Sequence, residues 1–176
     1  MRNPGTGPHG SRKFYFTFFE SPLGDFGLVA TDKGLCEIRT RISSRKSFIV
    51  YLKKSYPEIP QENPEKLKTV TRQLTEYFAG KRQRFTCKLD LEQGTGFQQK
   101  VWKALQSIPH GQTKSYAWIA ETIGKPRAVR AVGGANGKNP IPIIVPCHRV
   151  IRKDGSIGGY TGGLDKKRFL LGLEGA

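Results

Sequence analysis

The pattern of apolar residues changes near residue 94, and this change limits the folds that the chain can adopt. Before Gly94, short aromatic or alternating runs accompany one well-marked helix, whereas helical stripes dominate after it. Gly94-Thr95-Gly96 is a natural join. We therefore predict an α+β protein with domains at residues 13–92 and 93–176. Residues 1–12, with Pro4, Pro8 and three glycines, are expected to form a mobile tail.

The first domain is predicted to begin with a small antiparallel sheet. Its strands are expected at Lys13–Phe19, Phe26–Ala30 and Leu35–Arg39, and Asp32-Lys33-Gly34 has the composition of a hairpin turn with glycine in the left-handed conformation. Arg84–Leu91 alternates apolar with polar residues, which predicts a further strand with Cys87 directed into the core.

One helix is clear in the first domain. Asn63 followed by Pro64 is a typical helix start, and Gly80 supplies the stop. The apolar residues between them fall on one face: Leu67, Val70, Leu74, Tyr77 and Phe78.

The second domain has the signals of a helix-turn-helix. A stripe from Phe97 to Leu105 is broken by Pro109-His110-Gly111. Ser115 then caps a second helix, which carries Trp118, Ile119 and Ile123 and ends at Gly124. Pro126 is expected to open a third helix, and two short helices joined by a turn are what this module requires.

The third helix, Pro126–Asn136, combines small residues with two arginines, Arg127 and Arg130. Such a surface can approach another backbone closely. Alternatively, the small residues only permit tight packing inside the domain. The arginines favour an outward-facing role, because a core face would not carry them unpaired.

Charge points to a polyanionic partner. Thirty Lys and Arg against fourteen Asp and Glu give a net charge of +16. The excess is +7 before Gly94 and +9 from Gly94 onward, so charge alone does not say which half contacts the partner. The sequence has no apolar run of the roughly 18 to 20 residues that a membrane span needs, and no signal-peptide core, so we expect an intracellular protein with no membrane partner. Three widely spaced cysteines argue against a disulfide-held fold.

A candidate nucleophile follows the apolar run Ile143–Val145, in Pro146-Cys147-His148-Arg149-Val150. A cysteine attacks as a thiolate, and since its free pKa is about 8.5, it needs a base or a positive environment near neutral pH. His148 and the basic surroundings offer both. The alternative is a buried structural cysteine beside a structural histidine.

The surrounding motifs favour the nucleophile. Pro146-Cys147-His148-Arg149-Val150, Asn139-Pro140, Arg130-Ala131-Val132-Gly133-Gly134 and Gly159-Tyr160-Thr161-Gly162-Gly163 together resemble the signature of the O6-alkylguanine-DNA alkyltransferases. The resemblance is dense from about Gly94 to Glu174 and only architectural before that. It implies an N-terminal ribonuclease-H-like α/β domain and a C-terminal helix-turn-helix, winged-helix-like domain that holds the active site.

The resemblance also implies roles for individual residues. Cys147 is the alkyl acceptor, His148 its base through a water, and Glu174 the carboxylate that orients His148. Tyr116 donates a hydrogen bond to a ring nitrogen of the leaving guanine, and Asn139 braces the active-site loop. The substrate contacts are the carbonyls of Cys147 and Val150, which accept from the exocyclic amine, the N–H of Thr161 near O6, and the neighbouring Tyr160.

DNA contacts are implied for the third helix. Its small surface, with Arg127, Ala128, Ala131 and Gly133, would lie in the minor groove of double-stranded DNA that contains O6-alkylguanine. Arg130 resembles an arginine finger that fills the gap left by a flipped base, the alternative being an ordinary phosphate contact. The implied protein acts as a monomer without a cofactor, in the cytoplasm of a prokaryote or the nucleus of a eukaryote.

Some family members bind zinc in the N-terminal domain through Cys and His. This chain has Thr31 and Cys36 where that pattern requires Cys and His, and Thr is not a zinc ligand of the usual kind. We therefore predict no metal.

Three other functions compete with this one. A zinc nucleobase deaminase needs P-C-x-x-C, and Val150 occupies the last position, which excludes it. A thiol hydrolase would turn over repeatedly. A non-enzymatic lesion-binding protein would lack the acceptor cysteine, which this chain has.

Overall fold

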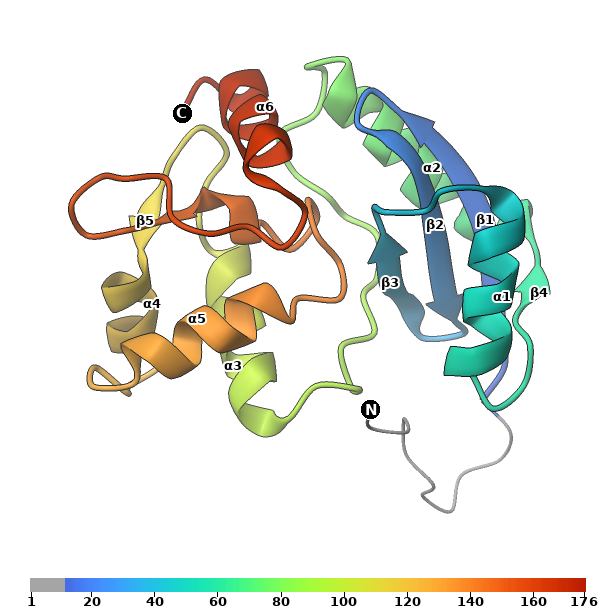
Figure 1. Ribbon diagram of the computed structural model, residues 1–176, viewed down its shortest axis with the longest axis horizontal. Helices are drawn as coiled ribbons and strands as arrows, with labels where there is room; N and C mark the ends of the chain where they lie inside the picture. The colour runs from blue at the N-terminus through green and yellow to red at the C-terminus, as the bar shows by residue number, and fades with distance from the viewer. Residues whose placement is uncertain (1–11) are drawn as a thin grey trace. The chain divides into compact units, whose positions relative to one another are not determined.

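The computed structural model describes residues 12–176, which divide into two compact units between Gln93 and Gly94 (Figure 1). This division lies one residue beyond the expected boundary. The predicted mobile tail falls on residues 1–11, outside the described residues, and on Arg12. The Arg12 guanidinium lies 2.6 Å from a carboxylate oxygen of Glu92, so Arg12 already contacts the N-terminal unit.

A four-stranded sheet with the order β3-β2-β1-β4 organises the N-terminal unit. β1 (Phe14–Ser21), β2 (Gly24–Thr31) and β3 (Gly34–Arg39) are antiparallel, and β4 (Gln61–Glu62) pairs in parallel with β1. The turn before β3 requires glycine for two reasons. Gly34 has a φ of +153°, and a Cβ there would lie 2.4 Å from the carbonyl oxygen of Lys88.

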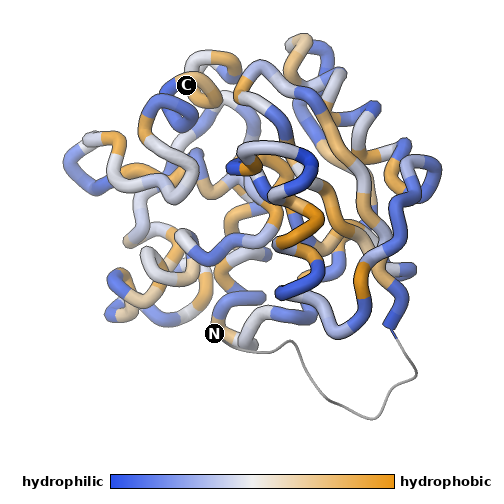
Figure 2. The backbone as a smooth tube through the Cα atoms, turned by 45° about the vertical axis from the view of Figure 1, so that its right-hand side comes forward, coloured by the Kyte–Doolittle hydropathy of each residue, from blue (hydrophilic) through white to orange (hydrophobic). Residues whose placement is uncertain are grey.

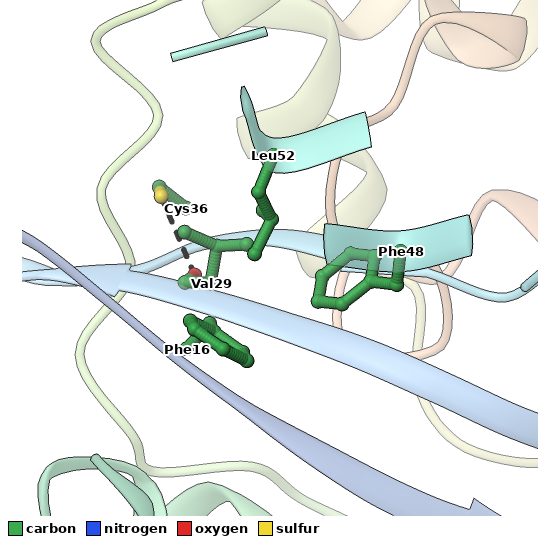
Figure 3. Close-up of a cluster of buried hydrophobic side chains, with 5 residues drawn as sticks. All are labelled: Phe16, Val29, Cys36, Phe48 and Leu52. Atoms are coloured by element: carbon green, nitrogen blue, oxygen red, sulfur yellow. Dashed lines mark hydrogen bonds between the residues drawn. The ribbon is translucent and has the colours of Figure 1, made fainter. Parts of the chain in front are cut away.

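The two helices of this unit cover opposite faces of the sheet. α1 (Arg45–Ser55) places Phe48 and Leu52 against Phe16 and Val29 (Figure 3). α2 (Pro64–Phe78) instead places Phe78 against Phe19 and Phe26. Neighbouring side chains of a strand point to opposite sides, so Phe16 and Phe19 belong to different cores. Apolar and hydrophilic residues alternate along the backbone, as the colours of Figure 2 show.

The expected start and stop of α2 are confirmed, while α1 was not predicted. The Asn63 side chain accepts from the backbone N–H of Lys66, and Gly80 follows the helix with a φ of +71°. The start signal of α1 is a capping box between Ser44 and Ser47, in which serine replaces the usual Glu or Gln. Only Phe48 and Leu52 are buried along it, which leaves a weak apolar stripe.

The predicted strand over 84–91 is wrong, although the alternation of burial is real. Phe85, Cys87 and Leu89 are half-buried, but the segment forms only an isolated bridge between Leu89 and Leu35. Gln73 of α2 supplies the missing partner, because its side-chain oxygen accepts from the backbone N–H groups of Thr86 at 2.9 Å and Cys87 at 3.3 Å. A side chain thus replaces a neighbouring strand. Burial raises the pKa of Cys87 to about 11.

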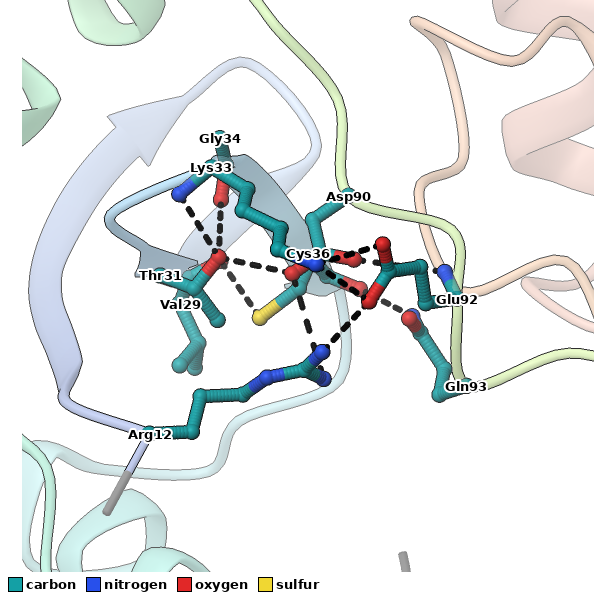
Figure 4. A network of polar contacts seen from close by, with 9 residues as sticks. All are labelled: Arg12, Val29, Thr31, Lys33, Gly34, Cys36, Asp90, Glu92 and Gln93. Carbon is teal, nitrogen blue, oxygen red and sulfur yellow. Dashed lines mark hydrogen bonds and ion pairs between the residues drawn. The ribbon is translucent and has the colours of Figure 1, made fainter. Parts of the chain in front are cut away.

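A polar network occupies the region where the zinc pattern considered above would require Cys and His (Figure 4). Thr31 donates to the buried carboxylate of Asp90 at 2.7 Å, and the Cys36 thiol points to the carbonyl oxygen of Val29 at 3.3 Å. Burial raises the pKa of Cys36 well above that of a free thiol. Within residues 12–176, no three His, Cys, Asp or Glu side chains come together as a metal site would need. The absence of a metal stays a prediction.

The C-terminal unit is built around short helices. α3 (Gly96–Gln106), α4 (Tyr116–Thr122) and α5 (Val129–Gly137) pack together, and α6 (Leu164–Glu174) ends the chain (Figure 1). The 3-10 turn η1 (Cys147–Arg149) leads into β6 (Val150–Ile151), which pairs in parallel with β5 (Lys114–Ser115). The expected helix-turn-helix is α4 and α5: Ser115 caps α4, and Gly124 follows it with a φ of +69°.

Two details of this unit differ from expectation. α5 begins at Val129 and not at Pro126, because Pro126 and Arg127 form a turn; its N-cap, Ala128, makes no side-chain hydrogen bond to the helix. α6 was not predicted, since Gly163, with a φ of +104°, starts it without a side-chain cap. No helix among the described residues is long and apolar enough to cross a bilayer.

Candidate active site

A strained turn precedes the cysteine. The Asn139 side chain spans this turn, donating to the Val145 carbonyl at 2.7 Å and accepting from the Ile141 N–H at 3.0 Å. Within it, Ile143 has a φ of +77°, which is unfavourable for a β-branched residue and costs about 1–3 kcal/mol. The fully buried environment of Ile143 and the two Asn139 bonds hold this conformation. Asn139 therefore braces the segment that delivers Cys147.

Cys147 lies buried at the start of η1. Removal of the thiol from water raises its pKa, while the Asn139 side chain and the charge of Lys167 act in the opposite direction. The resting side chain is therefore a thiol, which needs a base before it can attack.

His148 has the geometry of that base. Its Nε2 lies 2.8 Å from Oε1 of Glu174, the last residue of α6, and both side chains are fully buried. An ionised carboxylate only accepts, so Nε2 carries the proton and Nδ1 keeps its lone pair. Nδ1 has no hydrogen-bond partner in the described part of the chain. Burial lowers the pKa of His148, although Glu174 acts in the opposite direction. The lowered pKa favours a neutral ring.

Arg149 completes this arrangement and was missed as a site residue. Its Nε and NH2 groups bind Glu174 at 2.8 and 2.9 Å, and its NH1 donates to the carbonyl of Ile108 at 2.7 Å. The bidentate pair compensates the carboxylate charge of Glu174 and fixes its position. The sequence signal was an arginine beside a cysteine-histidine pair, which becomes informative only when the arginine is known to be buried.

Lys167 of α6 is a second missed residue. It is completely buried, and its ammonium donates to the carbonyls of Val150 and Ile157. Burial lowers its pKa to about 8, while Cys147 acts in the opposite direction. Lys167 thus joins α6 to both sides of the loop after η1 and places a titratable cation near the thiol.

The two backbone carbonyls expected to bind substrate already accept hydrogen bonds. The Cys147 carbonyl accepts from the Val150 N–H and, at 3.4 Å, from the buried Asn136 side chain, another residue that sequence reasoning missed. The Val150 carbonyl accepts from Lys167. A carbonyl oxygen has two lone pairs, so that of Val150 retains one acceptor position, whereas that of Cys147 is more fully used.

Two tyrosines lie close to the thiol. Tyr116 opens α4, and a Cβ added to Gly158 would lie 3.5 Å from its hydroxyl oxygen. Burial and the nearby Cys147 raise the pKa values of both Tyr116 and Tyr160, so both phenols stay protonated and able to donate. Thr161 is exposed, and its hydroxyl donates to the carbonyl of Gly137 at 3.0 Å.

α5 has one buried side and one exposed side. Val132, Ala135 and Asn136 are buried, and the Ala135 carbonyl accepts from the indole N–H of Trp102 at 3.0 Å. On the other side, Arg130 and Ala131 are exposed, as is Arg127 in the preceding turn, while Ala128 and Gly133 are half-buried. Neither arginine forms an ion pair within residues 12–176.

The structure therefore brings Cys147, His148 and Glu174 together with Tyr116, Asn139, Val150 and Tyr160. Thr161 lies at the edge of this group, bonded to the end of α5. The exposed arginines and small residues form a surface of the same unit that adjoins this group, because a Cβ added to Gly133 would lie 3.9 Å from the ring of Tyr116.

Comparison with known proteins agrees with this arrangement. Residues 14–91 match the ribonuclease-like domain of 6-O-methylguanine DNA methyltransferase, and residues 96–176 match the DNA-binding domain of the same family. The methylated-DNA–protein-cysteine methyltransferase of Methanosarcina acetivorans is 46% identical over 92% of this chain and 99% of its own length. That of Mycolicibacterium paratuberculosis is 57% identical over 88% of both chains.

Solved structures agree as well. The crystal structure of Mycobacterium tuberculosis O6-methylguanine methyltransferase has a TM-score of 0.79 and 42% identity, covering 92% of this chain and 93% of its own. A complex of Mycobacterium tuberculosis OGT with DNA has the same TM-score and 44% identity, covering 92% of each chain. The expected α+β fold, with a ribonuclease-like and a DNA-binding domain, is confirmed, and the chain belongs to the 6-O-methylguanine DNA methyltransferase family.

Proposed function

We propose that this protein repairs DNA by transferring the alkyl group of O6-alkylguanine irreversibly to its own Cys147. The observation that carries this proposal is the buried thiol next to His148, whose Nε2 is bonded to Glu174 and whose Nδ1 is free to accept. The relatives' name, methylated-DNA–protein-cysteine methyltransferase, describes the same transfer.

The thiol is activated by His148. Nδ1 takes the proton of Cys147 through a water, and the imidazolium that forms is stabilised by the carboxylate of Glu174. Lys167 adds positive charge near the thiolate. The sulfur then attacks the alkyl carbon, a sulfur–carbon bond forms, and the bond from that carbon to O6 breaks.

Guanine leaves with the electron pair of the broken bond. The protonated Tyr116 hydroxyl donates to a ring nitrogen as negative charge develops on the base. This bond is stronger in the transition state than in the ground state, so it lowers the barrier. The carbonyl of Val150 accepts from the exocyclic amine, and the Thr161 N–H lies near O6. The carbonyl of Cys147 is the second acceptor, in place of its 3.4 Å bond from Asn136. Tyr160 closes the other side of the base.

The reacting carbon lies inside a stacked duplex, so the nucleotide must be extruded at a cost of a few kcal/mol. α5 provides the surface for this step. Its exposed small residues admit it to the minor groove, and Arg130 fills the vacated stack. The groove beside Arg130 is contacted by Arg127, Ala128, Ala131 and Gly133.

A lesion-binding protein on the same scaffold is the main alternative. It would not need an acceptor cysteine, nor a histidine held in one tautomer by a buried carboxylate. A thiol hydrolase would need a second base or a cofactor to release the product. No residue in the sequence is evidently positioned for that purpose.

The first prediction concerns pH. The base must be neutral, and burial lowers the pKa of His148 below its usual value near 6.5. The rate of reaction with a free alkylated guanine base should therefore stay constant as pH falls to about 6.5. It should decrease only at lower pH, through the lowered pKa. The stability of the protein should change in the same direction. A histidine that is buried as a neutral ring makes the folded state less stable as the pH falls below the pKa of that histidine in the unfolded chain. Circular dichroism at each pH separates the two effects, and a half-maximal rate above pH 6.5 in folded protein would contradict the role of His148.

The second prediction separates extrusion from chemistry. Arg130→Ala should slow repair of a lesion in duplex DNA by roughly ten-fold or more, because about 1.4 kcal/mol of lost stabilisation of the flipped state suffices for that. The rate of reaction with the free alkylated base should change by less than about two-fold. Arg127→Ala removes an equal charge from a groove contact outside the vacated stack, so it should slow duplex repair less than Arg130→Ala does. Equal losses on both substrates would indicate a folding defect or a direct role in transfer.

The third prediction concerns stoichiometry. The product is a thioether, which water or another thiol does not readily reverse, so each molecule should repair one lesion. Lesions repaired should plateau at the number of protein molecules added. Cys147→Ser should bind DNA but transfer nothing, because a hydroxyl is a far weaker nucleophile than a thiol beside a base. Repair that continues past equivalence would refute the single-turnover mechanism and favour the hydrolase.

A further inference from the structure

The positive charge of the N-terminal unit is concentrated in one segment. Residues 12–93 contain sixteen Lys and Arg and ten Asp and Glu. Residues 38–57, here called the basic segment, hold six of these cations and no acid. Elsewhere in the unit, ten cations balance ten acids. The whole excess of this unit therefore lies on the end of β3, the connection that follows it, and α1.

The cations of the basic segment are exposed and mostly unpaired. Arg41, Lys46, Lys53 and Lys54 are exposed and form no ion pair within the described residues. Arg39 and Arg45 lie instead over aromatic rings, 3.6 Å from the centroid of Tyr51 and 4.9 Å from that of Phe18. Glu37, which precedes the segment, lies 3.6 Å from Arg39 and accepts from the hydroxyls of Tyr51 and Tyr56.

Stability of α1 does not explain these charges. A helix favours acids in its first turn and cations in its last, because of its dipole. α2 follows this rule with Glu65, whereas the first turn of α1 has no acid and contains Arg45 and Lys46. Lys53 and Lys54 in the last turn do suit the dipole, but the cations at the start oppose it. An external anion would offset this cost.

We propose that the basic segment is a second DNA-binding surface, which contacts the phosphate backbone of duplex DNA and reads no sequence. This proposal adds DNA binding outside the C-terminal unit. It rests on the proposed function only in that DNA is the partner, and it does not depend on alkyl transfer to Cys147. Lys46 and Lys53 lie on one side of α1, two turns or roughly 10 Å apart. Duplex DNA carries about one charge per 1.7 Å of its axis, so both ammonium groups find phosphates within that span.

The test compares two triple variants of the full chain with undamaged duplex DNA. One is Lys46→Gln, Lys53→Gln, Lys54→Gln. The matched control is Lys13→Gln, Lys81→Gln, Lys88→Gln, which removes three exposed, unpaired lysines from the same unit outside the basic segment. Thermal unfolding of each variant confirms that the fold is retained.

The expected result is a change in salt dependence that is specific to the basic segment. The slope of log affinity against log salt should become shallower by roughly 0.9 for each phosphate that the variant no longer neutralises, hence by as much as about 2.7 in the first variant. The control should keep the slope of the unmodified protein. Equal slopes for both variants would overturn the proposal, because the effect would then reflect net charge or nothing at all.

A direct measurement supports the comparison. Lysine acetylation of the unmodified protein, followed by mass spectrometry, should show protection of Lys46, Lys53 and Lys54 when DNA is bound. Lys13, Lys81 and Lys88 should react equally with and without DNA. Unchanged reactivity of all six lysines would also overturn the proposal, while leaving alkyl transfer by Cys147 untouched.

Discussion

The carboxylate of Glu174 is the group on which the site depends. It is fully buried, and it binds His148 through one oxygen and Arg149 through both. A buried carboxylate is stable only when its charge and lone pairs are satisfied, which Arg149 achieves. The same contacts hold the end of α6 against η1, so the packing of α6 and the tautomer of His148 depend on the same carboxylate. Removing Arg149 or Glu174 would leave the charge of the other buried and unpaired.

A second constraint acts from the other side of Cys147. The positive φ of Ile143 is a conformation that the chain would not adopt alone, and the Asn139 side chain holds it from both ends. Strain stored next to a reactive group requires surroundings that over-determine it. The thiol is therefore placed by Asn139 before the cysteine and by Glu174 and Lys167 after it.

Much of this arrangement was predictable, and the failures have physical reasons. The caps at Asn63 and Ser115 and the stops at Gly80 and Gly124 are local signals, so α2 and α4 were expected correctly. The segment 84–91 has the alternation of a strand, but Gln73 satisfies its backbone, which no periodicity reveals. Arg149 and Lys167 were missed because their importance comes from burial, and a sequence gives charged residues no such sign. Resemblance to the family directed attention to Cys147, His148 and Glu174, and the geometry adds the tautomer that makes His148 a base.

The central claim is that one buried thiol, and no other group, receives the alkyl group. Cys36 and Cys87 offer an internal comparison, since burial raises the pKa of each and neither has a histidine beside it. The direct measurement is peptide mass spectrometry after incubation with duplex DNA that contains O6-methylguanine. The account predicts a mass gain of one methyl group on the peptide with Cys147, and unmodified peptides with Cys36 and Cys87. An unmodified Cys147 peptide from protein that binds the lesion tightly, or a methyl group on another cysteine, would contradict it.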